Sequence, residues 1–293
     1  MSGRMDRRAF LGALPAAALA MRGLDGPAGA LAPRGLDGLA IQGAKPRLDA
    51  IGVQVYTLRA EMADDTDRTL AAIAEIGYTE VELFGDYALA GREMRNKLDA
   101  VGLRCASSHV SIETVRDDWD ATLESAQELG QALIVVPSLP NNVRGTEGLV
   151  RVGEEFNEAG AAARAAGLRF GYHNHDWEFA PLAGGVLPIE VLLESTDPEL
   201  VDWQMDIFWT VKGAGDPYAL IEAYSGRVTS VHVKDRTPSG DMADVGAGVI
   251  DFRRILGRAE ELGLLHQFVE HDFPADAIES VRASFAGLQR LIG

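Results

Sequence analysis

The chain has 293 residues, of which 47% are hydrophobic and one is cysteine, so it can bury one barrel-sized core or two small ones and cannot form an intrachain disulfide. Its formal net charge is −17; residues 1–45 carry +3, so the remainder carries −20. A body this acidic repels phosphate backbones and anionic membrane surfaces, which argues against nucleic acid or a lipid surface as partners.

The first 45 residues predict an export signal followed by a spacer. Arg7 and Arg8 precede Phe10 and Leu11, and an apolar stretch then extends to about Met21. Paired arginines before a short apolar region are typical of twin-arginine signals, and the region is too short to span a membrane. We therefore expect a periplasmic or secreted protein without a membrane anchor, with residues 46–293 as a single catalytic domain. A disordered basic tail is the alternative.

Beyond residue 46, short apolar runs alternate with longer segments of helical period, as in parallel βα units. We expect strands near residues 51–56, 79–84, 103–109, 132–137, 168–174, 200–206, 228–233 and 267–271. The helices are expected near 66–76, 90–101, 115–129, 146–166, 187–195, 216–224, 251–262 and 275–291. An open doubly wound sheet shows the same alternation, but eight units favour an α/β fold of the (β/α)₈ TIM-barrel type.

Polar residues lie at the ends of the first three strands and just beyond the fifth and sixth. The residues at the ends of the first three strands suit recognition of substrate hydroxyl groups; they are Gln54, Tyr56, Glu82 and His109. Beyond the fifth and sixth strands lie Trp177 and Trp209, whose ring faces can lie against a sugar. The alternative is that both only pack in the core or at the rim. Together these residues predict a binding site for a small carbohydrate.

The ends of the fifth to eighth strands carry imidazoles and carboxylates. Because side chains alternate between the two faces of a strand, these groups are expected to face one common space. A divalent ion of intermediate softness accepts both ligand types and polarises a carbonyl. We therefore predict a divalent-metal site with one ligand from each strand, namely His173, Asp206, His232 and Glu270.

Two further residues share these faces. His175 is a candidate catalytic residue together with Glu270 and Lys234. It is interpreted as a fifth ligand, as a group that orients substrate, or as a loop histidine in solvent. Lys234 is expected to neutralise an enolate oxygen or to move a proton, unless it is a rim lysine with no chemical role. Asp235 is the nearest candidate for its partner, although adjacent residues of a strand point in opposite directions.

A glycine-containing segment, residues 244–252, follows the seventh strand. Gly246 and Gly248 would let the backbone approach a ligand, although a lone Gly-x-Gly is a weak phosphate signal. Asp251 is a favoured N-cap residue. The segment therefore predicts an active-site loop and a helix that begins at Asp251.

The strings YHNH, MDIFW, VHVKD, GAGVIDF and FVEHD occur in this order, and with them the chain resembles the xylose-isomerase-like barrels of the sugar phosphate isomerase/epimerase family over residues 48–293. The resemblance implies a divalent cation, often manganese, held at the ends of strands five to eight; Asp206, His232 and Glu270 match the last three ligands. Ketose epimerases have a glutamate at the fifth-strand position, where this chain has His173. A histidine there looks more like inosose dehydratase and relatives that act on 3-keto-glycosides.

The resemblance thus implies proton abstraction next to a carbonyl, with Mn²⁺ stabilising an enediolate and Glu270 or Lys234 handling the proton. We expect a sugar isomerase or epimerase first, and β-elimination or hydration on a keto-sugar or 3-keto-glycoside as the alternative. A phosphodiesterase of the endonuclease type shares the barrel but needs a basic groove. A periplasmic sugar-binding protein without catalysis is a further alternative, and a homo-oligomer is left open.

Overall fold

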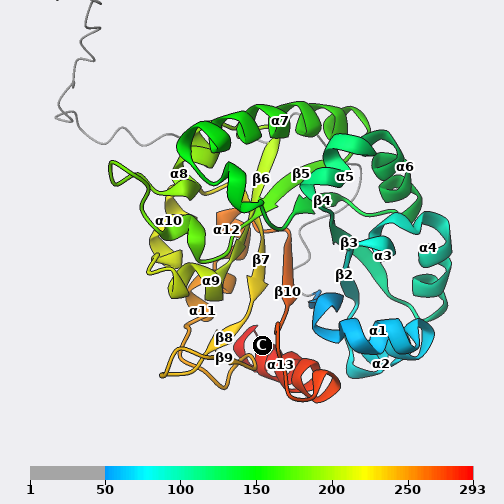
Figure 1. The fold of residues 1–293 in the computed structure, drawn as a ribbon. Coiled ribbons are helices and arrows are strands. Elements are labelled where there is room, and N and C mark those ends of the chain that lie inside the picture. The colour runs from blue at the N-terminus through cyan, green and yellow to red at the C-terminus, as the bar shows by residue number, and fades with distance from the viewer. Residues whose placement is uncertain (1–49, 293) are drawn as a thin grey trace, which may run out of the picture. The chain divides into compact units, whose positions relative to one another are not determined.

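The computed structural model describes residues 50–292, so the predicted signal and spacer lie outside the described residues. The barrel strands are β1 (Gly52–Gln54), β2 (Glu80–Phe84), β3 (Arg104–His109), β4 (Leu133–Val136), β5 (Arg169–His173), β6 (Val201–Asp206), β7 (Val228–Val233) and β10 (His266–Val269). They pair in parallel and close in the order β1-β10-β7-β6-β5-β4-β3-β2, which confirms the expected TIM barrel (Figure 1). A hairpin of β8 (Asp235–Arg236) and β9 (Met242–Ala243) follows β7.

Helices surround the barrel, as Figure 1 shows. Seven lie where the sequence predicts them: α2 (Thr66–Ile76), α4 (Gly91–Ala100), α6 (Trp119–Leu129), α7 (Thr146–Ala165), α8 (Pro188–Glu194), α10 (Pro217–Ala223) and α13 (Ala277–Ile292). The expected helix near 251–262 is instead two short ones separated by Gly257 and Arg258, α11 (Arg253–Leu256) and α12 (Ala259–Leu262). No described helix is long and apolar enough to cross a membrane.

Short helices that the sequence did not predict follow several strands. They are α1 (Arg59–Asp64), α3 (Asp86–Leu89), α5 (Ile112–Asp117), α9 (Ile207–Lys212) and the 3₁₀ turns η1 (Val55–Leu58), η2 (Asn141–Val143) and η3 (Trp177–Phe179). Of these, α5 overlaps the helix expected near 115–129, which is divided into α5 and α6 at Asp118. The first strand is accordingly shorter than expected, because the Gln54 side chain accepts a hydrogen bond from the Tyr56 N–H (3.0 Å) and turns the chain. Tyr56 therefore lies on η1, 37% exposed, and not on a strand.

Strand register brings the polar residues to one level inside the barrel. Asp206 pairs with His232, and His173 pairs with Gln204, across neighbouring strands. The intervening Met205 and Val231 are fully buried in the hydrophobic core, as period-2 alternation predicts. The interior near the mouth is therefore polar, while the outer faces of the same strands carry the packing against the helices.

The Gly-x-Gly loop is held in place by Asp235. This buried carboxylate accepts hydrogen bonds from the backbone N–H groups of Gly246, Gly248 and Ile250, at 2.9, 2.9 and 3.2 Å. The expected helix start at Asp251 is wrong by two residues, because Phe252 takes the N-cap position and α11 begins at Arg253. The N–H groups of Gly246, Gly248 and Ile250 therefore bind the Asp235 carboxylate and do not face a ligand.

Helix α13 contacts this loop through Gly287. A Cβ atom at Gly287 would overlap the carbonyl oxygen of Val245. We expect Gly287→Ala to lower the free energy of unfolding by about 1–3 kcal/mol, the usual cost of overpacking. Urea denaturation measures it, with Gly145→Ala as the control, since a Cβ there meets nothing within 4 Å. Equal effects of the two substitutions would contradict the proposed close contact.

Candidate metal centre

Three of the four predicted ligands converge at the carboxyl ends of the strands. Asp206, His232 and Glu270 are buried, and each offers a ligand atom within 4.8 Å of the others. His173 lies beside them, with its Nε2 3.6 Å from Asp206 Oδ2. A second candidate group consists of three imidazoles, His109, His173 and His232, within the same limit. Residues far apart in sequence therefore form one cluster, although its use as a metal site stays a prediction.

His232 lies between two carboxylates. Its Nδ1 is 2.6 Å from Glu270 Oε2 and its Nε2 is 2.5 Å from Glu82 Oε2. Burial opposes a charge on this imidazole, but the two carboxylates outweigh burial and raise the pKa of His232 to about 10. The ring is therefore protonated at neutral pH in this arrangement. It must lose that proton before it can bind a metal.

Lys234 is fully buried and contacts three acidic residues. Its Nζ donates to Asp272 Oδ1 at 2.8 Å and lies 2.8 Å from Glu270 Oε2 and 2.9 Å from Asp206 Oδ2. Burial lowers the pKa of the lysine, but these carboxylates outweigh it and raise the pKa above its ordinary value. The expectation that Asp235 is the partner is wrong, because Asp235 points to the Gly-x-Gly loop instead.

Gln204 fixes the tautomer of His173. Its Nε2 donates to Glu82 Oε1 (2.7 Å), so its Oε1 faces the histidines and can only accept a hydrogen bond. His173 Nδ1, 3.0 Å from that oxygen, must then be the donor. Burial lowers the pKa of His173 well below its usual value, so the ring is neutral and its Nε2 carries a lone pair.

That lone pair faces a second acceptor. Asp206 Oδ2 is buried beside Lys234 Nζ (2.9 Å) and receives no other hydrogen bond from the described residues, and burial raises the pKa of Asp206 to about 6. Two acceptors 3.6 Å apart with no proton between them are suited to share a cation. The donor set therefore fits a divalent ion. Lys234, which now lies against Asp206 and Glu270, would compete with it for the same oxygens.

His175, predicted as a catalytic residue, lies at the side of the cluster. Burial lowers its pKa to about 3, and its Nδ1 is buried without a hydrogen-bond partner in residues 50–292. The ring is 5.1 Å from that of His173 and 5.4 Å from that of Trp209. It is therefore a neutral group beside the cluster, and the alternative of a loop histidine in solvent does not hold.

The predicted substrate-binding residues divide into interior and rim groups. Gln54 and Glu82 are fully buried and hydrogen-bonded to each other (2.9 Å), and Glu82 also contacts His232. Trp177 lies on η3 after β5 and Trp209 on α9 after β6. Each has a cation over its ring, respectively Arg144 at 4.2 Å and Lys212 at 4.3 Å. Their indole Nε1 atoms are buried and have no hydrogen-bond partner among the described residues.

Sequence reasoning missed several supporting residues. Asn174 accepts hydrogen bonds from Trp203 Nε1 (2.9 Å) and from the Asp206 N–H (3.1 Å), which fixes the end of β6. Asp272, the partner of Lys234, lies beyond the end of β10, where strand alternation gives no signal. Gln204 shares the inward face of Asp206, as period-2 alternation predicts, but its contacts with His173 and Glu82 were not predicted. The missed residues orient the cluster and hold its charge.

Glu178 fixes the segment that carries His175. It accepts hydrogen bonds from the Tyr172 hydroxyl (2.5 Å) and from the His175 N–H (2.9 Å). Burial raises the pKa of Glu178 to about 7. The folded protein thus keeps a proton that the unfolded chain releases near pH 4.5, so this carboxyl lowers the free energy of unfolding as pH rises from about 4.5 to 7.

We expect Glu178→Gln to remove this part of the pH dependence, on the order of 2 kcal/mol between pH 5 and pH 8. Urea denaturation at both pH values measures it. The exposed Glu158, replaced in Glu158→Gln, is the control and should keep the wild-type slope. An unchanged slope in Glu178→Gln would show that the raised pKa is wrong.

Asp206 offers the most direct test of metal binding. We expect Asp206→Ala to bind at least about tenfold less divalent metal, since it removes a buried ligand oxygen, while the far-ultraviolet circular dichroism remains that of the wild type. Elemental analysis after equilibration with Mn²⁺ gives the metal content. Asp120→Ala, which removes an exposed carboxylate on α6, is the control. Wild-type metal content in Asp206→Ala would rule out this ligand.

Comparison with protein families matches residues 70–289 to the family described as "Xylose isomerase-like TIM barrel". A sugar phosphate isomerase/epimerase structure from Parabacteroides distasonis has a TM-score of 0.73 and 30% identity, over 87% of this chain and 97% of that one. Inosose dehydratases of Clostridium beijerinckii and Geobacillus kaustophilus are each 24% identical to this chain over 58% of its length. The matches span only 63% and 61% of those two proteins.

Proposed function

The chain belongs to the xylose isomerase-like TIM-barrel family, and we propose that it removes a proton from the carbon next to the carbonyl of a carbohydrate, with the help of a divalent metal. The observation that carries this proposal is the position of Glu270. Its Oε2 contacts both His232 (2.6 Å) and Lys234 (2.8 Å) within the candidate metal cluster. A base, the ammonium group of Lys234 and candidate metal ligands therefore lie in one buried space.

Glu270 is suited to be the base. Burial raises the pKa of this carboxyl, but Lys234 and His232 outweigh burial and hold the pKa below its usual value, so Glu270 is ionised at neutral pH. Both contacts use Oε2, which leaves Oε1 without a hydrogen bond from the described residues and available to a substrate C–H. A bound divalent ion would act as a Lewis acid that polarises the substrate carbonyl.

Lys234 is suited to stabilise negative charge and not to accept a proton. Its three acidic neighbours keep it protonated, so its ammonium group can face an enediolate oxygen as that oxygen gains charge. A cation in a water-poor space interacts more strongly with such a charge than it would in water. Glu270 and Lys234 therefore have separate roles, one in proton transfer and one in charge stabilisation.

These roles predict different variant phenotypes. We expect Glu270→Gln to abolish exchange of the substrate α-proton with solvent deuterium, because the amide cannot accept the proton. Lys234→Met should keep exchange but lower turnover by about 10²–10³-fold, the usual cost of one lost electrostatic contact. Nuclear magnetic resonance in D₂O, on keto-sugars and keto-glycosides, measures both, and Asp120→Ala should exchange like the wild type. Wild-type exchange in Glu270→Gln would remove Glu270 from this role.

Two reactions can follow proton removal. Our first choice is isomerisation or epimerisation, in which a proton returns to the sugar. The relatives named inosose dehydratase favour β-elimination on a keto-sugar or keto-glycoside as the second candidate. Deuterium enters the product in both cases, but only elimination releases water or a second molecule, so product analysis separates them. Sugar binding without metal and without exchange would instead support a non-catalytic binding protein.

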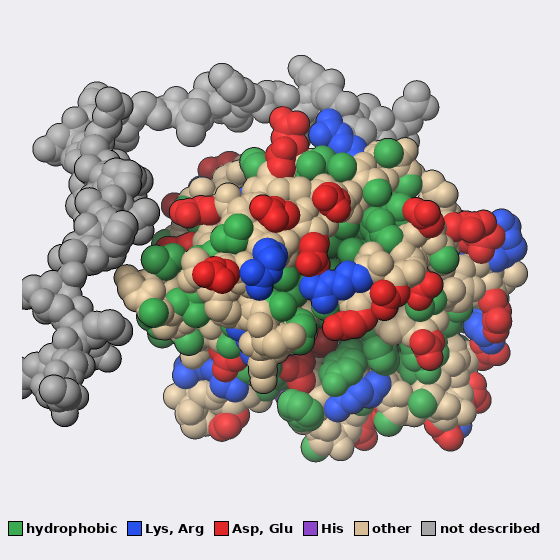
Figure 2. Space-filling view, turned by 45° about the horizontal axis from the view of Figure 1, so that its top comes forward, with side chains coloured by type: hydrophobic (Ala, Val, Ile, Leu, Met, Phe, Trp, Pro, Cys, Tyr) green, Lys and Arg blue, Asp and Glu red, His purple; other side chains and the backbone are tan. Residues whose placement is uncertain are grey.

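We propose Mn²⁺ as the metal, because a set of imidazoles and carboxylates suits a divalent ion of intermediate softness. A small neutral carbohydrate also suits the charge of the protein. Figure 2 shows Asp and Glu side chains spread over the face it presents, with Lys and Arg between them. An acidic surface of this kind disfavours nucleic acid and anionic membranes as partners.

Export by the twin-arginine route completes the proposal. A pathway that moves folded proteins suits a barrel whose metal ligands come from separate strands and meet only after folding. We expect the double substitution Arg7→Lys and Arg8→Lys to retain the protein in the cytoplasm, because the paired arginines form the export signal. Cell fractionation measures the distribution, with Arg22→Lys as the control. An unchanged periplasmic yield in the double variant would contradict this route.

A further inference from the structure

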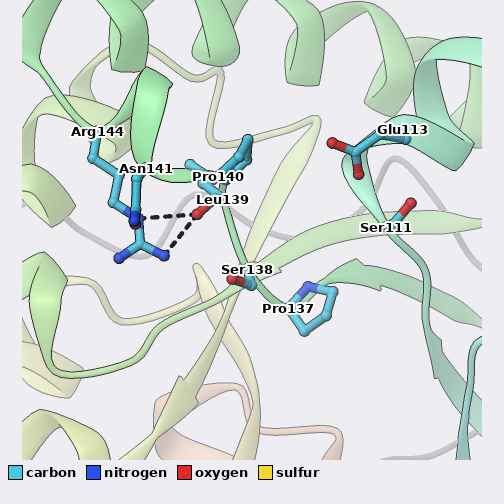
Figure 3. A pocket seen from close by; sticks show the side chains of 8 residues that line it. All are labelled: Ser111, Glu113, Pro137, Ser138, Leu139, Pro140, Asn141 and Arg144. Atoms are coloured by element: carbon cyan, nitrogen blue, oxygen red, sulfur yellow. Dashed lines mark hydrogen bonds between the residues drawn. The ribbon is translucent and has the colours of Figure 1, made fainter.

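A groove of about 410 Å³ lies at the carboxyl ends of β3 and β4. Its lining comes from the segment after β3, which includes the start of α5, and from the segment after β4, which includes η2; Figure 3 shows these side chains. The lining residues are Ser111, Glu113, Pro137, Ser138, Leu139, Pro140, Asn141 and Arg144. This volume is in the range of small-molecule sites, and none of these residues belongs to the cluster described above.

The walls of the groove are held in place by the fold. Arg144 donates from Nε and Nη2 to the carbonyl oxygen of Leu139, at 2.9 and 2.7 Å. The Ser111 hydroxyl accepts from the Thr114 N–H (3.1 Å) and so fixes the start of α5. Two prolines restrict the strand-end segment between them. A ligand would therefore find this surface formed before it binds, which reduces the entropy cost of binding.

The lining chemistry suits a neutral polyhydroxyl ligand. Ser111 and Ser138 offer hydroxyl groups, and Asn141 offers both an amide donor and an amide acceptor. Glu113 and Arg144 lie at opposite sides of the groove (Figure 3) and carry opposite charges. A carboxylate or phosphate near Arg144 would face Glu113, whereas sugar hydroxyl groups can donate to one residue and accept from the other.

The groove is connected to the candidate site through two residues. Arg144 lies over the ring of Trp177 at 4.2 Å, and Trp177 is one of the predicted substrate-binding residues. Ser111 comes two residues after His109, whose ring stacks on that of His232 at 5.3 Å. A sugar held at the cluster would thus have the groove at its side, on the β3 and β4 edge of the mouth.

We infer that the groove is the subsite for a second sugar residue, so that the substrate is a glycoside or disaccharide and not a free monosaccharide. This inference rests on the proposed function, since it assumes that a first sugar residue binds at the cluster. The groove then discriminates between substrates by size, because only a substrate with a second ring fills it. The reacting carbon belongs to the ring at the cluster.

Calorimetry on the Mn²⁺-loaded protein tests the inference, with glucose against the neutral disaccharides maltose, cellobiose, lactose and trehalose. We expect at least one disaccharide to bind about tenfold more tightly than glucose. Ser138→Trp should remove this advantage by filling the groove and leave glucose binding unchanged; Asn141→Trp is a second variant in case the first does not fold. Ser225→Trp, an exposed position on the loop between α10 and β7, is the control and should keep the advantage.

Equal affinities for glucose and every disaccharide in the wild type would overturn the inference. So would a disaccharide advantage that persists in both groove-filling variants. Exchange of the α-proton in a keto-monosaccharide, without any disaccharide advantage, would leave the proposed function standing and remove only the subsite. Disaccharide binding that depends on the groove, together with no α-proton exchange in any keto-sugar or keto-glycoside, would support the subsite and contradict the proposed chemistry.

Discussion

Four carboxylates are buried at the mouth of the barrel, and the charges that neutralise them determine the arrangement of the whole site. Within residues 50–292, Glu82, Asp206, Glu270 and Asp272 contact only two cationic side chains, His232 and Lys234. Buried charge is costly unless it is paired, so this cluster remains short of positive charge. A divalent ion would supply what is missing. The same shortage explains why the imidazolium of His232 and the ammonium of Lys234 hold their protons so firmly.

The fold places this cluster by simple geometric rules, which is why much of it could be predicted. Alternation along a strand, together with the common direction of parallel strands, is sufficient to put Asp206, His232 and Glu270 in one group. The eight βα units and the polar strand ends likewise follow from sequence pattern. The features that could be predicted from the sequence are those that depend only on the periodicity of strands and helices.

The remainder depends on side-chain geometry across the barrel. Glu82 meets His232 across 150 residues of sequence, and no local pattern indicates that pairing. The choice of Asp272 over Asp235 as the partner of Lys234 follows from the turn after β7, where the backbone N–H groups of the Gly-x-Gly loop bind Asp235. The tautomer of His173 depends on Gln204, whose own orientation is set by Glu82. Each of these depends on three-dimensional packing and not on periodicity.

A crystal structure of the protein grown with Mn²⁺, with anomalous diffraction data, tests the central claim most directly. The account predicts one strong anomalous peak within about 2.0–2.4 Å of ligand atoms from Asp206, His232, Glu270 and His173. It also predicts that Lys234 Nζ moves away from Asp206 and Glu270, because an ammonium group and a divalent ion repel each other at such distances. A peak elsewhere, or Lys234 unmoved among its carboxylates with no metal bound, would contradict the account.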